Sequence, residues 1–196
     1  MNLVIIDYGA GNIQSLQFAL KRLGVEGMLS RDPKQIQAAD RVIFPGVGQA
    51  QAAWQKLNES GLQELIPELK QPVLGICLGM QLMCQHTEEG DTPGLGIFPL
   101  EVKRFSSELK VPQIGWNKVE QLKSPLFDGL DEDYVYLVHS YYAALSEYTA
   151  ATTTYGILYS ASLEKDNFYG CQFHPEKSGP YGQRILKNFI EQSTAE

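Results

Sequence analysis

The sequence predicts an α/β fold with a doubly wound, mostly parallel sheet flanked by helices and additional antiparallel strands in the C-terminal half. Short apolar runs such as Leu3–Ile6 lack polar alternation, as expected for strands that are buried on both faces. These runs alternate with amphipathic segments as far as Gln85, which is typical of right-handed βαβ crossovers. After Ile97 the helical spacing gives way to short strand-like runs.

The first half of the chain supplies the expected parallel strands and their helices. The strand Leu3–Ile6 ends at Asp7, and apolar residues then recur at helical spacing over residues 13–23 until Gly24 stops the helix. Asp32 followed by Pro33 predicts a capped helix through Ala39. The other expected elements are strands at Val25–Ser30, Val42–Phe44 and after Pro72, and helices near Ala50–Leu57 and Leu62–Leu69.

The second half is expected to be largely β, some of it antiparallel, and to begin with a loop at Gly90–Gly96. Apolar residues on one face predict a final helix over Gly182–Gln192. No repeat or linker interrupts the chain, so we expect residues 1–196 to form a single domain. The strand-like runs are Glu101–Phe105, Trp116–Leu122, Tyr134–Val138, Ala150–Thr154, Ile157–Leu163 and Phe168–Phe173.

Composition narrows the functional classes. The chain has 196 residues, 43% of them hydrophobic and 20% charged, which is ordinary for a globular enzyme. A net charge of −7 without a basic stripe argues against nucleic-acid binding. No apolar run approaches the roughly 20 residues of a membrane span, and the N-terminus does not resemble a signal peptide. Three cysteines form no even disulfide framework, so we expect a cytoplasmic protein with reduced thiols.

The segment Gly75-Ile-Cys-Leu-Gly79 has the pattern of a nucleophile elbow with cysteine as the nucleophile. A buried strand precedes Cys77 and a helix begins after it, so the sharp turn presents the thiol. The positive end of the helix dipole favours the thiolate, which is the attacking species. The competing interpretation is that Cys77 is a buried structural cysteine, which is the most common role of this residue type.

A candidate base and its partner lie far downstream, in Gln172-Phe-His-Pro-Glu176. Residues two apart on a strand point to one face, so Glu176 can orient the imidazole of His174 and stabilise its charged form. The competing interpretation is that His174 is a core histidine whose hydrogen bonds are satisfied. Catalytic triads assemble in space, so the long separation from Cys77 is no objection.

A third segment, Pro45-Gly-Val-Gly48, follows a strand and is either a tight turn or an oxyanion hole. Glycines let peptide N–H groups turn toward a developing negative oxygen, and the N–H of Leu78 would be the second donor. Cys171 and His174 could supply two metal ligands. The sequence has no second Cys/His pair to complete such a site, so we expect no metal site. The segment Asp7–Asn12 is not a dinucleotide-binding fingerprint, and no cofactor is predicted.

Together these motifs make the chain similar to the class I (triad) glutamine amidotransferases, whose fold is flavodoxin-like. The segments Asp7–Ile13, Gly115–Asn117, His139–Tyr141 and Asp166–Gly179 narrow the resemblance to the glutaminase subunits of imidazole glycerol phosphate synthases, and it runs nearly end to end.

The resemblance implies that Cys77, His174 and Glu176 hydrolyse L-glutamine to glutamate and ammonia through a glutamyl thioester. Backbone N–H groups of Val47 and Leu78 would hold the oxyanion. Glutamine would be bound by a further set of residues, with Glu89 suited to its ammonium group and the backbone near Ser140 to its carboxylate. This set is Gly46, Gly48, Gln81, Glu89, Ser140 and Tyr141.

The resemblance also implies a heterodimer with a (β/α)8 cyclase subunit that receives the ammonia and makes imidazole glycerol phosphate and aminoimidazole carboxamide ribotide in histidine biosynthesis. A flexible Gly46–Gly48 segment is a plausible switch that the partner controls. Exposed aromatic residues anchor interfaces, so Tyr8, Asn12 and Trp116 are candidates for the docking face. Core packing is an equally good interpretation of Trp116.

Other functions remain open at this point. A paralogous glutaminase could feed ammonia to a different synthase, such as a sugar amidotransferase. A binding module that has lost the reaction, or a cysteine peptidase on a similar sheet, would also fit part of the pattern. Stimulation by a cyclase and its nucleotide distinguishes the first alternative, and hydrolysis of peptide bonds without a partner distinguishes the last.

Overall fold

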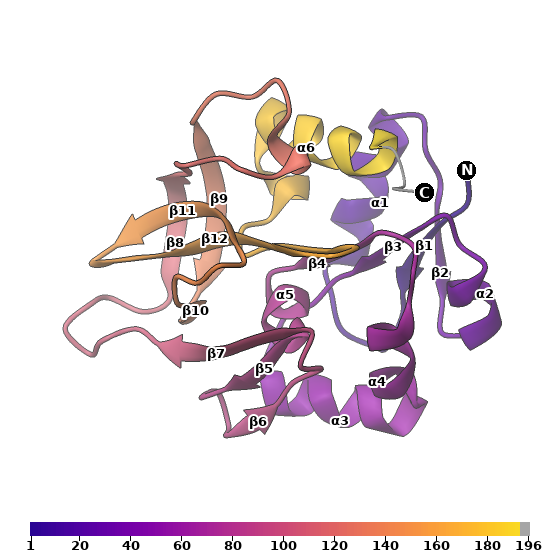
Figure 1. The fold of residues 1–196 in the computed structure, drawn as a ribbon, viewed down its shortest axis with the longest axis horizontal. Coiled ribbons are helices and arrows are strands. Elements are labelled where there is room, and N and C mark those ends of the chain that lie inside the picture. The colour runs from indigo at the N-terminus through magenta and orange to yellow at the C-terminus, as the bar shows by residue number, and fades with distance from the viewer. Residues whose placement is uncertain (193–196) are drawn as a thin grey trace.

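A block of parallel strands forms the centre of the computed structural model, which describes residues 1–192 (Figure 1). The spatial order β2-β1-β3-β4-β13 is that of flavodoxin-like sheets, in which ligands bind beyond the carboxyl ends of the strands. The last strand comes from the far end of the sequence and pairs in parallel with β4. The bounds are β1 (Leu3–Ile6), β2 (Gly27–Ser30), β3 (Arg41–Phe44), β4 (Val73–Ile76) and β13 (Phe168–Cys171).

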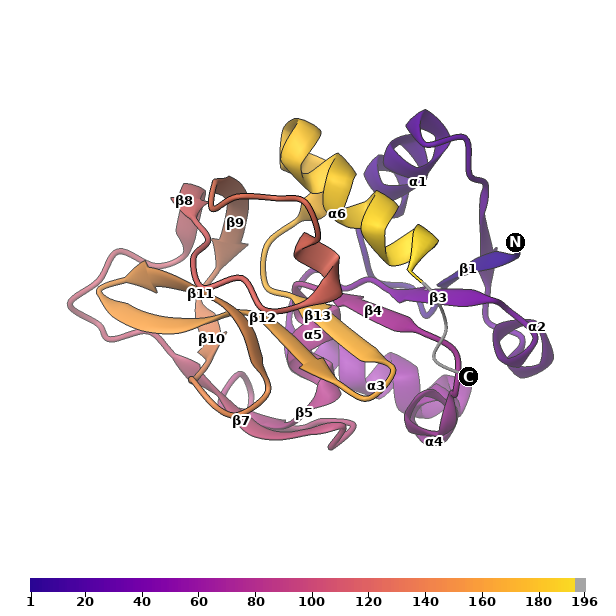
Figure 2. The same cartoon turned by 45° about the horizontal axis from the view of Figure 1, so that its top comes forward.

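Helices cover both faces of this block (Figures 1 and 2). On one face lie α1 (Ile13–Arg22) and α6 (Gly179–Glu191). The other face is covered by α2 (Pro33–Gln37), α3 (Ala50–Ser60), α4 (Leu62–Leu65) with a 3-10 turn over Ile66–Glu68, and α5 (Leu78–Met83).

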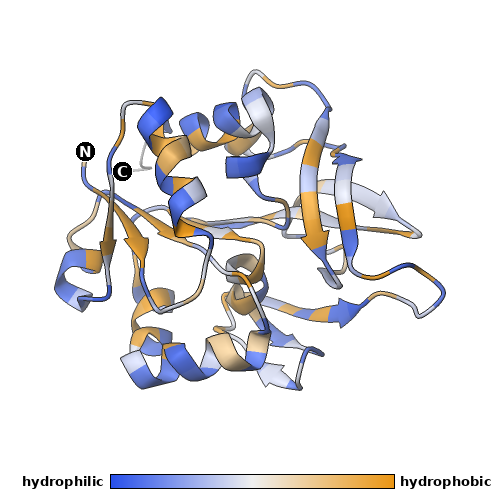
Figure 3. Ribbon diagram, turned by 180° about the vertical axis from the view of Figure 1, so that it is seen from behind, coloured by the Kyte–Doolittle hydropathy of each residue, from blue (hydrophilic) through white to orange (hydrophobic). Residues whose placement is uncertain are grey.

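The central strands are apolar throughout because each face packs against its own helical layer. In β1, Leu3 and Ile5 join the core beneath α1 and α6, whereas Val4 and Ile6 join the core beneath α3 and α5. All four residues are buried. Coloured by hydropathy, these strands form the apolar centre of the molecule (Figure 3). The predicted fold class is therefore confirmed.

The second half adds antiparallel strands beyond β13, as predicted. The runs near Glu101, Ala150 and Ile157 form β7 (Phe98–Arg104), β11 (Thr149–Tyr155) and β12 (Ile157–Lys165). Three short strands were not expected, namely β5 (Cys84–Thr87), β6 (Thr92–Pro93) and β10 (Tyr141–Ala143).

The helix that was expected to run to Gln85 ends at Met83. Backbone N–H groups of the following loop take the carbonyls that would continue it: Leu95 donates to Leu82 and Gly96 donates to Cys84. Competition from a segment distant in sequence is a tertiary effect, so local periodicity could not reveal it. Cys84 is therefore the first residue of β5, and the expected Gly90–Gly96 loop contains β6.

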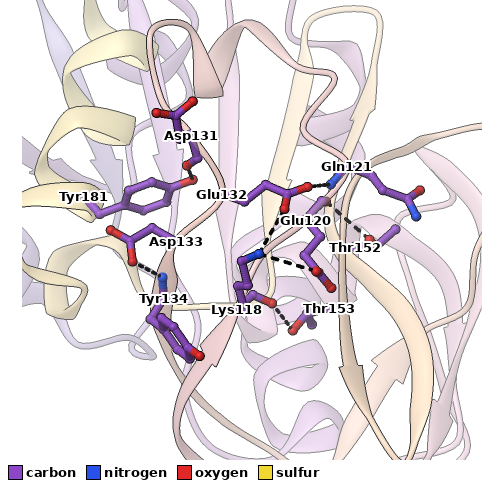
Figure 4. A network of polar contacts seen from close by, with 10 residues as sticks. All are labelled: Lys118, Glu120, Gln121, Asp131, Glu132, Asp133, Tyr134, Thr152, Thr153 and Tyr181. Atoms are coloured by element: carbon purple, nitrogen blue, oxygen red, sulfur yellow. Dashed lines mark hydrogen bonds and ion pairs between the residues drawn. The ribbon is translucent and has the colours of Figure 1, made fainter.

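The antiparallel pair β8 (Gln113–Lys118) and β9 (Tyr134–His139) stands apart from the large sheet. Its inner face buries Val135 and Leu137 against the α6 side of the core. A polar network holds the segment that connects the two strands (Figure 4). Lys118 contacts Glu132 at 3.1 Å, Glu132 accepts a hydrogen bond from the backbone N–H of Gln121 at 3.0 Å, and Tyr181 of α6 donates to the carbonyl of Asp131 at 2.9 Å.

Among residues 1–192, no helix combines the length and the apolar character that crossing a bilayer requires.

Candidate active site

The turn between β4 and α5 presents Cys77 as the sequence predicted. Its φ of 53° and ψ of −110° lie outside the regions that non-glycine residues favour, so the surrounding structure must hold this strained conformation. The backbone N–H of Cys77 donates to the carbonyl of Cys171 on β13 at 2.7 Å. The helix α5 starts at Leu78, whose N–H therefore has no partner within the helix.

Close approach of two loops explains why glycines flank the elbow. A Cβ at Gly79 would lie 2.0 Å from the carbonyl oxygen of Phe44, and a Cβ at Gly46 would lie 2.5 Å from the backbone nitrogen of Gly79. Both positions are closed to any side chain because the obstacles are backbone atoms. The Pro45–Gly48 segment is thereby pressed against the start of α5.

His174 and Glu176 form a buried pair, with Nδ1 of the histidine 2.8 Å from Oε1 of the glutamate. Their side chains are 2% and 3% exposed. The expected contact is present, but the expected geometry is wrong: β13 ends at Cys171, and a 3-10 turn over Pro175–Lys177 brings Glu176 back to the ring. Proline at the first position of that turn fixes its start.

The β8–β9 pair fixes the backbone around His174. The N–H of His174 donates to the carbonyl of Tyr136 at 3.0 Å. Ser178 closes the arrangement, since its hydroxyl donates to the carbonyl of His174 at 2.7 Å and accepts from the N–H of Tyr136 at 3.0 Å. The position of the histidine thus depends on a strand outside the parallel block.

The electrostatics of His174 suit a base that becomes charged. Burial disfavours the imidazolium, but Cys77 and Glu176 outweigh that effect and raise the pKa of His174 above its ordinary value. Nε2 is buried and has no hydrogen-bond partner among the described residues. With Nδ1 held by Glu176, Nε2 is the nitrogen that is free to exchange a proton.

Besides the imidazole of His174, two polar groups of the described residues lie near the sulfur of Cys77. The carbonyl oxygen of Val138 lies at 3.9 Å and Nε2 of Gln172 at 3.8 Å. Gln172 is connected in turn to Gln81, whose Nε2 lies 3.0 Å from Oε1 of Gln172 and 3.0 Å from the carbonyl of Tyr141. Gln172 was not among the predicted site residues, although it belongs to the same motif as His174.

A cavity of about 270 Å³ opens in front of the sulfur and collects most of the predicted site residues. Gly46 and Glu176 do not line it: Gly46 packs against the start of α5, and Glu176 contacts the ring of His174. Pro112, Val138 and His139 were not predicted and form part of the wall. The predicted residues that line the cavity are Val47, Gly48, Cys77, Leu78, Gln81, Glu89, Ser140, Tyr141 and His174.

In the wall of the cavity, the pKa values of Glu89 and His139 are shifted from their ordinary values. Burial raises the pKa of Glu89, and a hydrogen bond of 3.0 Å from the N–H of Ala50 partly opposes the rise. Burial lowers the pKa of His139 to about 4, so its ring is neutral near pH 7. Its Nδ1 donates to the carbonyl of Tyr141 at 2.7 Å. The cavity therefore offers a carboxylate at one side and a backbone held by a neutral histidine at another.

The three residues predicted for the docking face differ in their exposure to solvent. Trp116 is 55% exposed and stacks edge-on against Tyr136, so the core interpretation of this residue is wrong. Tyr8 is 5% exposed, which corrects the expectation of an exposed aromatic side chain. It turns inward because its hydroxyl donates to the carbonyl of Pro45 at 2.9 Å. Asn12 precedes α1 and is partly exposed.

The described part of the chain contains no cluster of three or more His, Cys, Asp or Glu residues that could hold a metal ion. Cys77, Cys84 and Cys171 are all free thiols.

Comparison with known sequences agrees with this geometry. The family described as glutamine amidotransferase class-I matches residues 4–193. The imidazole glycerol phosphate synthase subunit HisH of Bacteroides fragilis is 57% identical over 195 residues, covering 97% of this chain and 100% of that protein. The corresponding subunit of Haemophilus influenzae is 47% identical over 194 residues, with 97% and 98% coverage.

Solved structures share the fold at low identity. A crystal structure titled glutamine amidotransferase has a TM-score of 0.75 at 20% identity and covers 96% of this chain and 97% of its own. A chain in the PurLQS structure of Thermotoga maritima has a TM-score of 0.72 at 15% identity, with 96% and 97% coverage. These likenesses establish the architecture alone. Combined with the sequence relatives, they lead to one conclusion: the chain belongs to the class-I glutamine amidotransferase family, within the group of HisH subunits of imidazole glycerol phosphate synthase.

Proposed function

We propose that this chain is the glutaminase subunit of an imidazole glycerol phosphate synthase and that it acts as a single domain in the cytoplasm. It hydrolyses L-glutamine and delivers the ammonia to a cyclase subunit in histidine biosynthesis. The observation that carries the proposal is the buried His174–Glu176 pair, 2.8 Å apart, at the cavity into which the strained elbow presents Cys77.

The proposed reaction begins with transfer of the thiol proton of Cys77 to Nε2 of His174, leaving the electron pair on sulfur. The thiolate attacks the side-chain carbonyl carbon of glutamine, and the N–H groups of Val47 and Leu78 stabilise the oxyanion. Collapse expels ammonia, which takes its proton from His174. Water, deprotonated by His174, then cleaves the glutamyl thioester and releases glutamate.

The cavity fits the two ends of the amino acid. Glu89 supplies a carboxylate for the ammonium group, and backbone groups near Ser140 and Tyr141 meet the carboxylate. Both hydrogens of the Gln81 amide are directed at Tyr141 and Gln172, so Gln81 offers its Oε1 to the ligand as an acceptor. Gly46 and Gly48 let the oxyanion segment pass close to the substrate.

The partner that we propose is the cyclase subunit, docked on Trp116 and Asn12 and on the exposed face of β8–β9. Ammonia released into water is protonated and lost, which favours a glutaminase that works only within a complex. The alternative partner, a sugar-modifying synthase, has no support among the similar sequences described above.

Glutamate and ammonia should be measured for the chain alone, with the cyclase subunit, and with the cyclase subunit and its nucleotide substrate. We expect weak activity from the isolated chain and strong stimulation in the complete mixture. Stimulation by a sugar-modifying synthase in place of the cyclase would contradict the assignment. Efficient peptide hydrolysis by the isolated chain would contradict the reaction class.

A further inference from the structure

Gln172 lies between the sulfur of Cys77 and the amide of Gln81, and the reaction proposed above gives it no role. It directly follows β13 and is fully buried. Its Nε2 is 3.8 Å from Sγ of Cys77, and its Oε1 is 3.0 Å from Nε2 of Gln81. A buried amide next to a reactive sulfur can stabilise or destabilise the charged form, and the effect depends on which end of the amide faces the sulfur.

A backbone carbonyl fixes that orientation. The oxygen of Tyr141 can only accept hydrogen bonds, so Gln81 must direct its NH₂ group toward it, across 3.0 Å. The same nitrogen of Gln81 faces Gln172, which must therefore present its oxygen there. The remaining end of the Gln172 amide, its NH₂ group, is left to face the sulfur of Cys77. His139 holds the Tyr141 carbonyl from another side and strengthens this constraint.

We propose that Gln172 is a catalytic residue that donates an N–H hydrogen bond to Cys77 and stabilises its thiolate. In the thiol state the S–H group can rotate between the carbonyl of Val138 and Nε2 of His174, and the sulfur accepts from Gln172. When the proton moves to Nε2 of His174, the electron pair stays on sulfur and the Val138 carbonyl becomes repulsive. The Gln172 N–H then becomes a charge-assisted hydrogen bond, which is stronger than the neutral one.

Other titratable groups share this environment and must be kept constant in a test. His174 and Glu176 approach from the end of β13, Tyr8 from the loop after β1, and His139 from the end of β9. A substitution at Gln172 changes none of them. A difference in the reactivity of Cys77 between variant and parent therefore reports on the amide.

The test uses the full chain and needs no substrate. The rate of alkylation of Cys77 by iodoacetamide should be followed across pH by mass analysis of the peptide that contains it. Gln172→Met keeps the length of the side chain but removes the N–H. We expect its alkylation rate at neutral pH to fall about tenfold and the profile to move to higher pH, because hydrogen bonds to ionised groups are among the stronger ones.

Gln113→Met is the matched control. Gln113 is also a buried glutamine, and its amide lies 2.8 Å from the hydroxyl of Tyr159 without contacting Cys77. This variant should lose thermal stability but keep the parental alkylation profile. If it moves the profile as far as Gln172→Met does, loosened packing explains the effect and the proposal is wrong.

A second variant protects the test against misfolding of the first. Gln172→Glu keeps the shape and still accepts from Gln81, but its carboxylate places an oxygen instead of an N–H against the sulfur. Its profile should move to higher pH than that of Gln172→Met. An alkylation profile equal to that of the parent in either folded variant would overturn the proposal.

The inference rests on the proposed glutaminase function for its catalytic meaning, but alkylation is measured without glutamine. If the parent chain with its cyclase released no glutamate while the alkylation profiles shifted as expected, the function would fail and the hydrogen bond would stand. Normal glutamate release by Gln172→Met with the cyclase, together with an unshifted profile, would reject the inference and leave the function intact.

Discussion

The cavity at Cys77 and the outer face of the β8–β9 pair differ in how firmly the fold holds their side chains. Around the cavity, the triad candidates are buried, His174 and Glu176 contact each other at 2.8 Å, and Cys77 has a strained backbone conformation. On the outer face, defined here by Ile114, Trp116 and Tyr134, each side chain is more than half exposed. Rigidity at the first region suits chemistry that requires fixed geometry, whereas exposed apolar groups at the second suit association.

The two regions nevertheless meet at one residue. Tyr136 of β9 accepts a hydrogen bond from the N–H of His174, and its ring contacts Trp116 on the outer face. The surface proposed for docking is thus one residue away from the backbone of the proposed base. The following predictions test whether the two regions can be separated by substitution.

The largest effect is expected for Cys77→Ala. Without the nucleophile, glutamate release by the complex should fall by at least about a thousandfold, because loss of a nucleophile typically removes nearly all triad catalysis. Binding to the cyclase should remain unchanged, since Cys77 lies inside the cavity. Glutamate assays and calorimetric titration check the two halves of this prediction, and surviving activity would refute the role of Cys77.

A somewhat smaller effect is expected for Glu176→Gln, which keeps the shape and removes the charge. The kcat should fall by roughly a hundredfold to ten-thousandfold, as in other triads whose acid is neutralised. The KM for glutamine should change little because Glu176 does not line the cavity. Steady-state kinetics of the complex would show the split, and a change confined to KM would contradict it.

The same variant tests the electrostatics of the buried pair. The raised pKa of His174 means that the folded state binds its proton more tightly than the unfolded state, whose value is near 6.5. This contribution to stability is fully present below that unfolded pKa and is lost as pH rises through the higher folded one. Denaturant unfolding at a series of pH values checks this prediction. The free energy of unfolding should decline less with rising pH in Glu176→Gln than in the parent protein. Parallel curves for the two proteins would argue against the coupling.

For the outer face, Trp116→Ala should raise the Kd for the cyclase by about tenfold to a hundredfold, the range of an aromatic hot spot. Phe18→Ala is a matched control, because Phe18 on α1 and Trp116 are both 55% exposed. The control should bind the cyclase normally. Titration calorimetry distinguishes the two, and equal weakening would mean that exposed apolar area alone determines binding.

The smallest effect is expected for Tyr8→Phe, which removes the hydrogen bond to the carbonyl of Pro45. The free energy of unfolding should fall by about 1 kcal/mol, because a buried carbonyl is left unpaired. Since that carbonyl precedes the oxyanion segment, kcat should fall several-fold while the Kd for the cyclase stays constant. A higher Kd for the cyclase with a normal kcat would instead support the prediction that Tyr8 belongs to the docking face.

Sequence reasoning was sufficient wherever the determining forces are local. Continuous apolar runs identified the parallel strands, and the Asp32–Pro33 cap identified the start of α2, where the side chain of Asp32 accepts from the N–H of Lys34 at 2.9 Å. The elbow at Cys77 follows from its flanking glycines and the strand and helix on either side. These features depend on residues within one or two turns of each other, so the chain alone encodes them.

Only the tertiary structure decided features that depend on distant backbone. The end of α5 at Met83, the inward position of Tyr8 and the exposure of Trp116 result from segments that are far apart in sequence. The orientation of the Gln172 amide is set by a carbonyl on β10, which no local pattern near residue 172 reveals. Periodicity specifies which faces are buried, but hydrogen-bond partners are fixed only when the chain has folded and each buried polar group must find one.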